Sequence, residues 1–324
     1  MFLSLVLFAI GLVLLIYGGD WFVDGATGIA KRFNLPDIVV GATVVSIGTT
    51  LPEVMVSTTG ALQGSGAMAY GNAIGSIICN TALIAAISIV CNPGPVNVKS
   101  MKTPAIFFFG AAAMYCVAAY GLGEFPRWLG FIMLTVFAVY MVMTVRNGLK
   151  NPDSAAEEEE DEAKERKLWQ ELALLVVGAA VIAVGADLLV DHGQVIAIGL
   201  GVPETVVALL FVALGTSLPE LVTTITSLKK GRASLGVGNV IGANVFNLVL
   251  VSGVAVSLAP FPVPAENTLL NTGLNLSLVL DIPVMLGVMS LMIFPAMMTK
   301  KLGRWQGIAL LGIYLAFCVC QFML

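Results

Sequence analysis

The stretch VVSIGTTLPEVMVSTTG, residues 44–60, is almost wholly apolar or small, yet it holds a proline and a glutamate at its centre. Pro52 removes an amide that a helix would use, and Glu53 places a carboxylate among residues that suit a membrane interior. A charged carboxylate at the bilayer centre costs about 3 kcal/mol on insertion scales, so it persists only where it faces protein, water or a cation. The stretch therefore predicts a functional carboxylate within a membrane-spanning helix.

The whole chain has the composition of an integral membrane protein. Of its 324 residues, 58% are hydrophobic and 11% are charged, and the mean hydropathy is +0.96, whereas soluble domains carry about 25% charged residues. Its five cysteines are spaced for neither a disulfide framework nor a metal site, and we expect them to be small core residues. The net charge of −4 comes from one acidic run at 157–162, and nothing in the sequence indicates nucleic-acid binding.

The apolar runs predict an all-α membrane protein with ten spans. Each run is close to the ~20 residues that a helix needs to cross a bilayer, and none alternates like a barrel strand. The predicted spans are 2–23, 36–62, 69–91, 103–121, 127–146, 171–191, 203–228, 234–259, 275–294 and 304–323. The first lacks a basic leader and a small-residue cleavage site, so we expect a retained helix and no signal peptide.

The basic residues test this count. Ten spans place 15 of the 16 lysines and arginines on one side, with Arg127 as the exception, and the positive-inside rule makes that side cytoplasmic. Both termini are then expected outside, in a multi-pass protein of a prokaryotic plasma (inner) membrane. The charge-rich stretch 147–170 is the only long loop, and it predicts a cytoplasmic linker between a first half, 1–146, and a second half, 171–324.

A second copy of the opening motif, FVALGTSLPELV at 211–222, lies 167 residues further along the chain. At this offset 23 of the 66 positions from 18 to 83 are identical, including Gly, Pro, Asn and Glu residues that shared apolar composition cannot align. Five spans separate the copies, so they cross the membrane in opposite directions, as do the inverted-topology repeats of secondary transporters. Such proteins bind substrate near the midplane, where we expect Glu53 and its counterpart Glu220.

The residues around the two glutamates predict a site for a hard cation. Pro52 and Pro219 each free a helix carbonyl one turn earlier, and hydroxyl and amide oxygens lie nearby. The candidate ligands are the carboxylates of Glu53 and Glu220, oxygens of Thr49, Thr50, Thr216, Ser217, Ser76, Ser46 and Ala213, and the amides of Asn80 and Asn247. Oxygen-only sites suit calcium, sodium or magnesium, and a dry, flexible cage favours calcium, with sodium as its competitor.

The paired GTTLPE and GTSLPE motifs, with GNAIGSIICN and GNVIGANVFN downstream, resemble the two alpha-repeats of the calcium/cation antiporter superfamily, most closely its prokaryotic sodium/calcium exchanger branch. The resemblance covers nearly the whole chain. It implies alternating access at one central pocket, with the first and sixth spans sliding across a core formed by the others. It also implies that Glu53, Glu220 and the backbone oxygens of Thr49 and Thr216 hold calcium. The implied sodium ligands are Ser46, Thr50, Ser76, Ala213, Thr216 and Ser217, together with the glutamates.

Two positions depart from the family pattern. Some relatives have aspartate at the position of Asn247, and Ala243 lacks the hydroxyl that Ser76 supplies in the first repeat. With asparagine at both 80 and 247, the pocket carries a fixed charge of −2 if both glutamates are ionised. One calcium or two sodium ions neutralise that charge, and a third sodium would make exchange electrogenic. The sequence leaves both stoichiometries open.

We therefore expect a secondary active antiporter that exchanges sodium for calcium. The transported ions and the lipid bilayer are its expected partners, with no enzymatic activity, prosthetic group or obligatory protein partner. A proton/calcium antiporter using the same glutamates is the alternative, although the surrounding Thr, Ser and Asn oxygens favour sodium coordination. A channel would need a continuous polar pore, which interrupted helices do not require. An intramembrane enzyme would need a nucleophile–base pair or a metal constellation, and the spans contain no internal histidine and no Ser/Lys pair.

Some acidic residues fall outside this scheme. Asp20 and Asp24, like their counterparts Asp187 and Asp191, share a helix face near the end of a span, where we expect a capping or structural role. Asp281 lies inside the ninth span without a counterpart in the first repeat. For this residue we expect no more than a hydrogen bond within the bundle.

Overall fold

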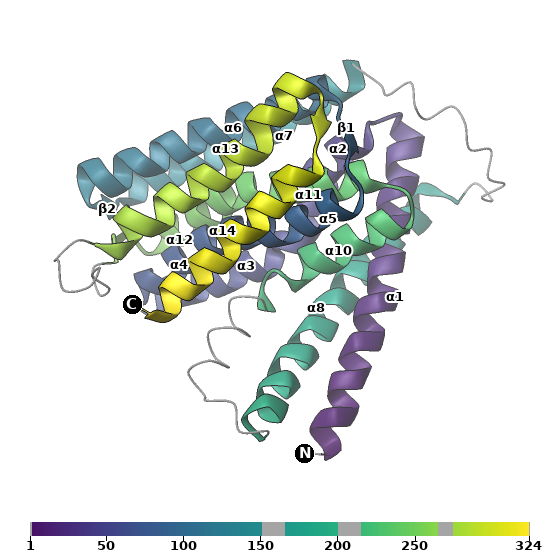
Figure 1. The fold of residues 1–324 in the computed structure, drawn as a ribbon, viewed down its shortest axis with the longest axis horizontal. Helices are drawn as coiled ribbons and strands as arrows, with labels where there is room; N and C mark the ends of the chain where they lie inside the picture. The colour runs from purple at the N-terminus through teal and green to yellow at the C-terminus, as the bar shows by residue number, and fades with distance from the viewer. Residues whose placement is uncertain (1, 151–165, 200–214, 265–274, 324) are drawn as a thin grey trace.

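The computed structural model describes residues 2–150, 166–199, 215–264 and 275–323 (Figure 1). Within them the chain is almost wholly helical, as the apolar runs predict. Its strands in these ranges are four segments of two residues each, joined in two antiparallel pairs. The fold class is therefore that of an all-α protein.

The elements of the first half alternate regular α-helices with short π-helical segments, in which the backbone hydrogen bonds reach one residue further than in an α-helix. In chain order they are α1 (Phe2–Phe33), α2 (Asp37–Val40), η1 (Gly41–Val45), α3 (Ser46–Leu62), α4 (Gly66–Cys79), η2 (Asn80–Ala85), α5 (Ala86–Cys91), β1 (Gly94–Pro95), α6 (Val98–Cys116), η3 (Val117–Leu122), β2 (Glu124–Phe125) and α7 (Arg127–Lys150).

The described part of the second half has the same character. Its elements are α8 (Leu168–Gly199), α10 (Leu218–Lys229), α11 (Ala233–Phe246), η5 (Asn247–Val251), α12 (Ser252–Leu258), β3 (Phe261–Pro262), η7 (Ser277–Asp281), α13 (Ile282–Thr299), β4 (Lys301–Leu302) and α14 (Arg304–Met323). Of the predicted linker 147–170, residues 151–165 lie outside the described ranges. The helices α7 and α8 extend a few residues into it from either side.

Most of the predicted spans are found as helices that are long and apolar enough to cross a membrane. Eight described helical stretches meet that criterion, and they correspond to the first six, the eighth and the ninth predicted spans. The tenth predicted span coincides with α14, a helix of 20 residues. The seventh, 203–228, begins outside the described residues, and its second part forms α10.

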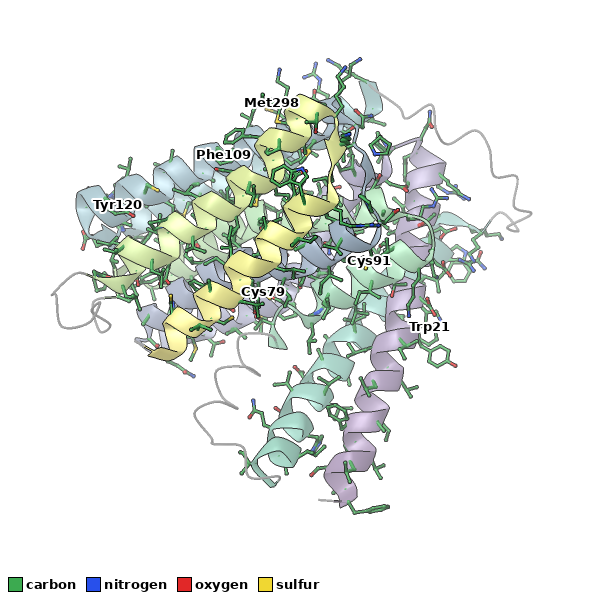
Figure 2. All side chains as sticks on the ribbon, in the orientation of Figure 1. Trp21, Cys79, Cys91, Phe109, Tyr120 and Met298 are labelled. Carbon is green, nitrogen blue, oxygen red and sulfur yellow. The ribbon has the colours of Figure 1, made fainter. Side chains whose placement is uncertain are left out.

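The outer surface of the bundle is apolar, and polar side chains are gathered inside it. Large apolar and aromatic side chains project outward from several helices, among them Trp21, Tyr120 and Met298 (Figure 2). Met298 is 84% exposed, while Glu53 and Glu220 are fully buried. An apolar exterior over a polar interior is the arrangement expected of a lipid-facing shell.

Two long helices, α1 and α8, lie side by side, and part of the pair extends beyond the rest of the bundle (Figure 1). The two helices are antiparallel, because Gly11 of α1 opposes Gly185 of α8 and Gly25 opposes Glu171. A methyl group on Gly25 would lie 2.6 Å from the carbonyl oxygen of Glu171. Glycine is therefore needed for the two backbones to approach this closely.

Ion pairs tie one end of α1 to the loop that follows α10. Lys230 Nζ lies 2.7 Å from Asp24 Oδ1 and 3.4 Å from Asp20 Oδ1. The neighbouring Arg232 lies 3.3 Å from Asp37 Oδ2, at the start of α2. The structural role expected for Asp20 and Asp24 is confirmed by these contacts.

The short strands join loops that the predicted span count assigns to the same side. β1 follows the third predicted span and pairs with β4, between the ninth and tenth, with Gly94 opposite Leu302. β2 follows the fourth and pairs with β3, after the eighth, with Phe125 opposite Phe261. Loops separated by an even number of spans emerge on the same side of a membrane, so both pairings agree with the predicted order.

The main hydrophobic core surrounds α4, α6, α11 and α13, and a smaller core joins α1 and α8 to η1. Tyr140 of α7 is fully buried and donates a hydrogen bond of 2.8 Å to the carbonyl of Ala42, which fixes η1. In the smaller core, Phe22 of α1 packs against Gly48. These contacts hold the segment 41–53, which carries the first glutamate, between the two cores.

Candidate functional site

The two glutamates lie on different helices, α3 and α10, which contact each other inside the bundle. Glu53 and Glu220 are both fully buried, and their carboxylates are close enough for their charges to repel. Within the described chain, none of the four carboxylate oxygens has a hydrogen-bond partner. The three ion pairs found there involve Lys230 and Arg232, so no basic side chain of these ranges balances either glutamate.

The helix around Glu53 differs from the expectation that Pro52 interrupts it. α3 runs without a break from Ser46 to Leu62, with Pro52 in its interior. The irregularity lies one turn earlier, in the π-helical segment η1. Pro52 still has no amide to offer the carbonyl of Gly48, so the predicted free acceptor does not require a break in the helix.

The second copy of the motif does show an interruption. Thr216 and Ser217 form a turn, and α10 begins at Leu218 with Pro219 in its first turn. This is the position where proline is tolerated best, because the first amides of a helix lack intrahelical partners. The two identical prolines therefore occupy different backbone contexts. Ala213, the remaining predicted ligand of this segment, lies outside the described residues.

The two predicted asparagine ligands occupy equivalent places. Asn80 is the first residue of η2 and Asn247 is the first residue of η5, so a π-helical segment begins at each of them, 167 residues apart. Both side chains are fully buried, and their amide nitrogens and oxygens lack partners in the described part of the chain. η2 contacts α10 and η5 contacts α3, so each asparagine's segment packs on a glutamate helix. π-Helical segments of this kind are frequent at functional sites.

Hydroxyl groups complete the cluster. The Thr50 and Ser217 hydroxyls are buried without a hydrogen-bond partner among the described residues. Thr49 and Thr50 lie beside the carboxylate of Glu220. Ser76, a buried residue of α4, lies one helical turn before Asn80. The structure thus gathers buried oxygens from both halves of the chain around the two carboxylates.

Two asparagines that the sequence interpretation left out of the site, Asn72 and Asn239, join the halves directly. Asn239 Oδ1 accepts hydrogen bonds from Thr49 Oγ1 at 3.1 Å and from Ser46 Oγ at 3.3 Å. Asn72 Oδ1 accepts one from Thr216 Oγ1 at 3.3 Å. The Thr49–Asn239 and Thr216–Asn72 bonds are the same contact shifted by 167 residues. Identity of both asparagines at that offset was the signal in the sequence.

Asn72 also contacts the first glutamate helix. Its Nδ2 donates to the carbonyl oxygen of Glu53 at 3.2 Å and to Ser57 Oγ at 2.8 Å. The first of these bonds occupies a helix carbonyl beside the motif, and the second fixes the amide orientation. Asn72 is therefore a positioning residue between α3, α4 and the turn at Thr216.

Replacing Asn239 with alanine is expected to weaken calcium binding about tenfold and to lower the free energy of unfolding by about 2 kcal/mol. The substitution removes the acceptor of Thr49 and Ser46, and each buried hydrogen bond contributes about 1 kcal/mol. Calcium dependence of uptake and thermal unfolding of the purified protein measure the two effects. Asn97→Ala, which removes the N-cap of α6, is the control: it should cost about 1 kcal/mol without changing the calcium dependence. Equal calcium dependence in both variants would contradict the role of Asn239.

The chemistry of the cluster is that of a hard-cation site. Its atoms are carboxylate, hydroxyl and amide oxygens, which suit calcium or sodium and not soft transition metals. No group of three or more His, Cys, Asp or Glu side chains that could hold a metal ion occurs in the described ranges. A buried carboxylate pair without a protein cation needs either a bound cation or protons to be stable in a membrane interior.

The chain matches the family model described as sodium/calcium exchanger protein over residues 3–146 and 171–323. It is 34% identical to an uncharacterized membrane protein of Methanocaldococcus jannaschii, over 95% of this chain and 94% of the relative. It is 28% identical to the sodium/calcium exchanger MaX1 of Methanosarcina acetivorans, over 97% of each chain. Among solved structures, it resembles the sodium–calcium exchanger NCX_Mj soaked with Na⁺ and Ca²⁺, with a TM-score of 0.79, 32% identity and 98% of each chain covered.

Proposed function

The chain belongs to the sodium/calcium exchanger family, and we propose that it exchanges sodium for calcium by alternating access at the site around Glu53 and Glu220. One observation carries this proposal: two fully buried carboxylates whose oxygens have no partner in the described chain. They lie among further buried hydroxyl and amide groups that also lack partners. A cation would supply the missing partner to all of them, and calcium and sodium enter as transported substrates.

The proposed calcium ligands are the carboxylates of Glu53 and Glu220 and the backbone oxygens of Thr49 and Thr216. Flexible coordination by 6–8 oxygens is typical of calcium, and a set of carboxylates and carbonyls from separate helices suits it. The proposed sodium ligands, in addition to the glutamates, are Ser46, Thr50, Ser76, Ala213, Thr216 and Ser217, with the amides of Asn80 and Asn247 completing the pocket.

The charge of the pocket explains why the two ions would compete. Two ionised glutamates carry a charge of −2, and the nearest described basic residues are engaged in ion pairs away from the site. A single calcium or two sodium ions offset that charge, and either load removes the repulsion between the carboxylates. The empty, doubly charged pocket would be costly in a membrane interior, which favours crossing only in a loaded state.

We further propose that ten helices form two inverted repeats, residues 1–146 and 171–324, joined by the linker 147–170. The paired bonds Thr49–Asn239 and Thr216–Asn72 support this arrangement, because a two-fold relation between repeats produces such contacts in pairs. The antiparallel course of α1 and α8, which occupy equivalent places in the two halves, supports it independently.

Alternating access would come from movement of the α1–α8 pair across the remaining helices. The pair packs on the body through an apolar core that includes Leu15, Phe22 and Ile182, and apolar contacts are not directional. Side-chain hydrogen bonds from α1 to other elements lie toward one end of the helix, at Asp20, Asp24 and Arg32. A helix held in this way can translate with little loss of contact.

The proposed location is a plasma membrane, with the linker and most basic residues in the cytoplasm and both termini outside. The contact of Arg32 with the carbonyl of Arg166, together with the ion pairs of Lys230 and Arg232, supports one common basic face. That grouping is the one the positive-inside rule requires.

Calcium uptake into proteoliposomes tests the coupling ion. Vesicles loaded with sodium and diluted into sodium-free buffer are expected to accumulate calcium, with or without a proton ionophore. Vesicles without internal sodium are the control and should accumulate none. Uptake that follows an imposed pH gradient and ignores sodium would replace this proposal with proton/calcium exchange at the same two glutamates.

A further inference from the structure

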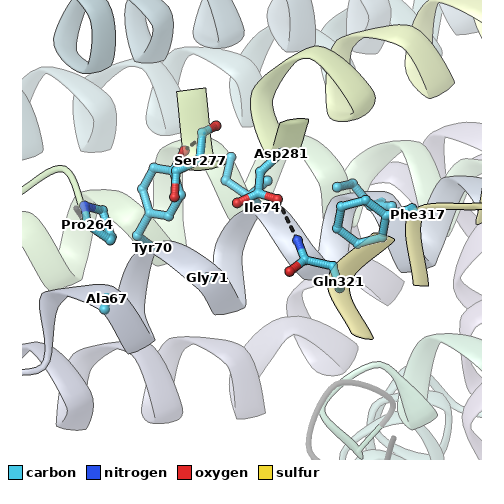
Figure 3. Close-up of a pocket in the computed structure, with 11 residues that line it drawn as sticks. Ala67, Tyr70, Gly71, Ile74, Pro264, Ser277, Asp281, Phe317 and Gln321 are labelled. Carbon is cyan, nitrogen blue, oxygen red and sulfur yellow. Dashed lines mark hydrogen bonds between the residues drawn. The ribbon is translucent and has the colours of Figure 1, made fainter. Parts of the chain in front are cut away.

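A second polar cavity lies away from the two glutamates, between α4, η7 and α14 (Figure 3). Its volume is about 240 Å³. The side chains that matter for its chemistry are Tyr70, Asp281, Phe317 and Gln321, which point toward one another from these three elements. The proposed exchange mechanism uses none of them.

The helix α4 separates this cavity from the central site. Gly71, Ile74, Gly75 and Ile78 line the cavity along one stripe of α4, while Asn72 and the predicted ligands Ser76 and Asn80 occupy a neighbouring stripe. A methyl group added to Gly71 or Gly75 would meet no atom within 4 Å. These glycines therefore leave open space on the cavity side. From Ala67 to Ile78 the lining extends about 16 Å along the helix, roughly half of a 30 Å hydrocarbon core.

The cavity holds a carboxylate without a cationic partner. Asp281, the last residue of η7, accepts a hydrogen bond of 2.8 Å from Gln321 Nε2 of α14 (Figure 3). The ion pairs of the described chain do not include Asp281, and no lysine or arginine lines the cavity. An intramembrane carboxylate that faces an open cavity is a functional feature until shown otherwise.

The backbone that carries Asp281 is held from both sides by tyrosines. The Tyr70 hydroxyl donates to the carbonyl of Ser277 at 3.4 Å, and the Tyr120 hydroxyl donates to that of Leu278 at 2.5 Å. These bonds fix both ends of the turn that presents the carboxylate to the cavity. The site is thus preformed: an anion, an amide and two aromatic rings surround one space.

We propose that this cavity binds an organic ammonium cation, with Asp281 as its counter-ion. Its volume corresponds to about eight water molecules at ~30 Å³ each, far more than a metal ion fills, and one carboxylate cannot supply the 6–8 oxygens that calcium takes. Hydrocarbon next to the ammonium group would contact Ile74 and Phe317, and the aromatic faces of Tyr70 and Phe317 suit a cation. An occupant would press on the helix that carries Asn72, so it is placed to influence exchange; that consequence alone rests on the proposed function.

Binding of radiolabelled benzylammonium to the purified full-length chain in neutral detergent, measured by equilibrium dialysis, tests the proposal without transport. We expect one saturable site per chain. Asp281→Asn should weaken binding at least tenfold, and benzyl alcohol, which has the same shape but no charge, should not compete. Gly75→Leu, which fills the cavity, should also weaken binding at least tenfold. Gly110→Leu is its matched control, because Gly110 of α6 is exposed with no atom near its added side chain, and it should bind like the wild type.

Absence of a saturable site, or unchanged binding in both Asp281→Asn and Gly75→Leu, would overturn the proposal. The same chemistry can come from a free amine or from the headgroup of an aminolipid, and nanodiscs separate these sources. If phosphatidylethanolamine discs weaken benzylammonium binding at least threefold relative to phosphatidylglycerol discs, the headgroup occupies the cavity. Equal binding in the two kinds of disc identifies a free amine as the ligand.

Discussion

Glu53→Gln and Glu220→Gln are each expected to abolish calcium exchange while leaving the fold intact. Both carboxylates are fully buried and lack partners in the described chain, so their charge is available to a bound cation. Glutamine keeps the size of the side chain but removes one of the two negative charges that offset calcium. Removing one partner of a buried charge pair costs about 3–5 kcal/mol, which corresponds to a loss of roughly 100-fold or more in affinity. Sodium-driven uptake of radioactive calcium into proteoliposomes measures the loss.

The fold should tolerate these substitutions, because an amide removes the repulsion between two neighbouring carboxylates. Thermal unfolding at or above the wild-type midpoint would establish that point. Asp20→Asn is the matched control, since Asp20 is an acidic residue of the membrane helices that is partly exposed and pairs with Lys230 at a helix end. It should reduce uptake only slightly. Wild-type uptake by Glu53→Gln would rule out the central pocket as the transport site.

Much of this architecture was predictable because membrane spans are written in long apolar runs and the repeat preserves special residues. The spans around α1 to α7 follow from hydropathy alone, since each helix must cover the bilayer thickness. Glu53 and Glu220 were identifiable as site residues because a carboxylate is costly in that setting. Asn80 and Asn247 were identifiable because asparagine recurs at the same offset within apolar helices.

The local backbone of the site could not be predicted from the sequence. Nothing in the composition of Asn80–Ala85 or Asn247–Val251 distinguishes a π-helical segment from an α-helix, because tertiary packing decides which carbonyl each amide reaches. The role of Asn72 depends on partners 144 residues away, at Thr216. The motif copies also differ in backbone although they are nearly identical in sequence: α3 continues through Pro52, whereas a turn precedes Pro219.

The same difference between identical positions predicts a large effect of Gly242→Ala. A methyl group on Gly242 would lie 2.5 Å from the Cα and 2.7 Å from the carbonyl oxygen of Ala42, and it would collide with Ser46 Oγ. Two of these three contacts are backbone atoms that cannot rotate away, so α11 must move from η1 and α3. Overpacking of a tight core costs about 1–3 kcal/mol, and the displacement would also separate Ser46 and Thr49 from Asn239. We expect a lower thermal midpoint and loss of most calcium uptake.

Gly75 is the control that the repeat itself provides, because it corresponds to Gly242 at the offset of 167. A methyl group there meets no atom within 4 Å, so Gly75→Ala should unfold and transport like the wild type. The helix-propensity difference between glycine and alanine, about 1 kcal/mol, favours alanine equally at both positions and cannot produce a contrast. If the two variants lose stability and uptake to the same degree, the close packing of α11 on η1 is not what distinguishes them. A contrast would mean that two identical glycines have different functions, one closing a helix contact at the ion site and the other leaving space for the cavity behind α4.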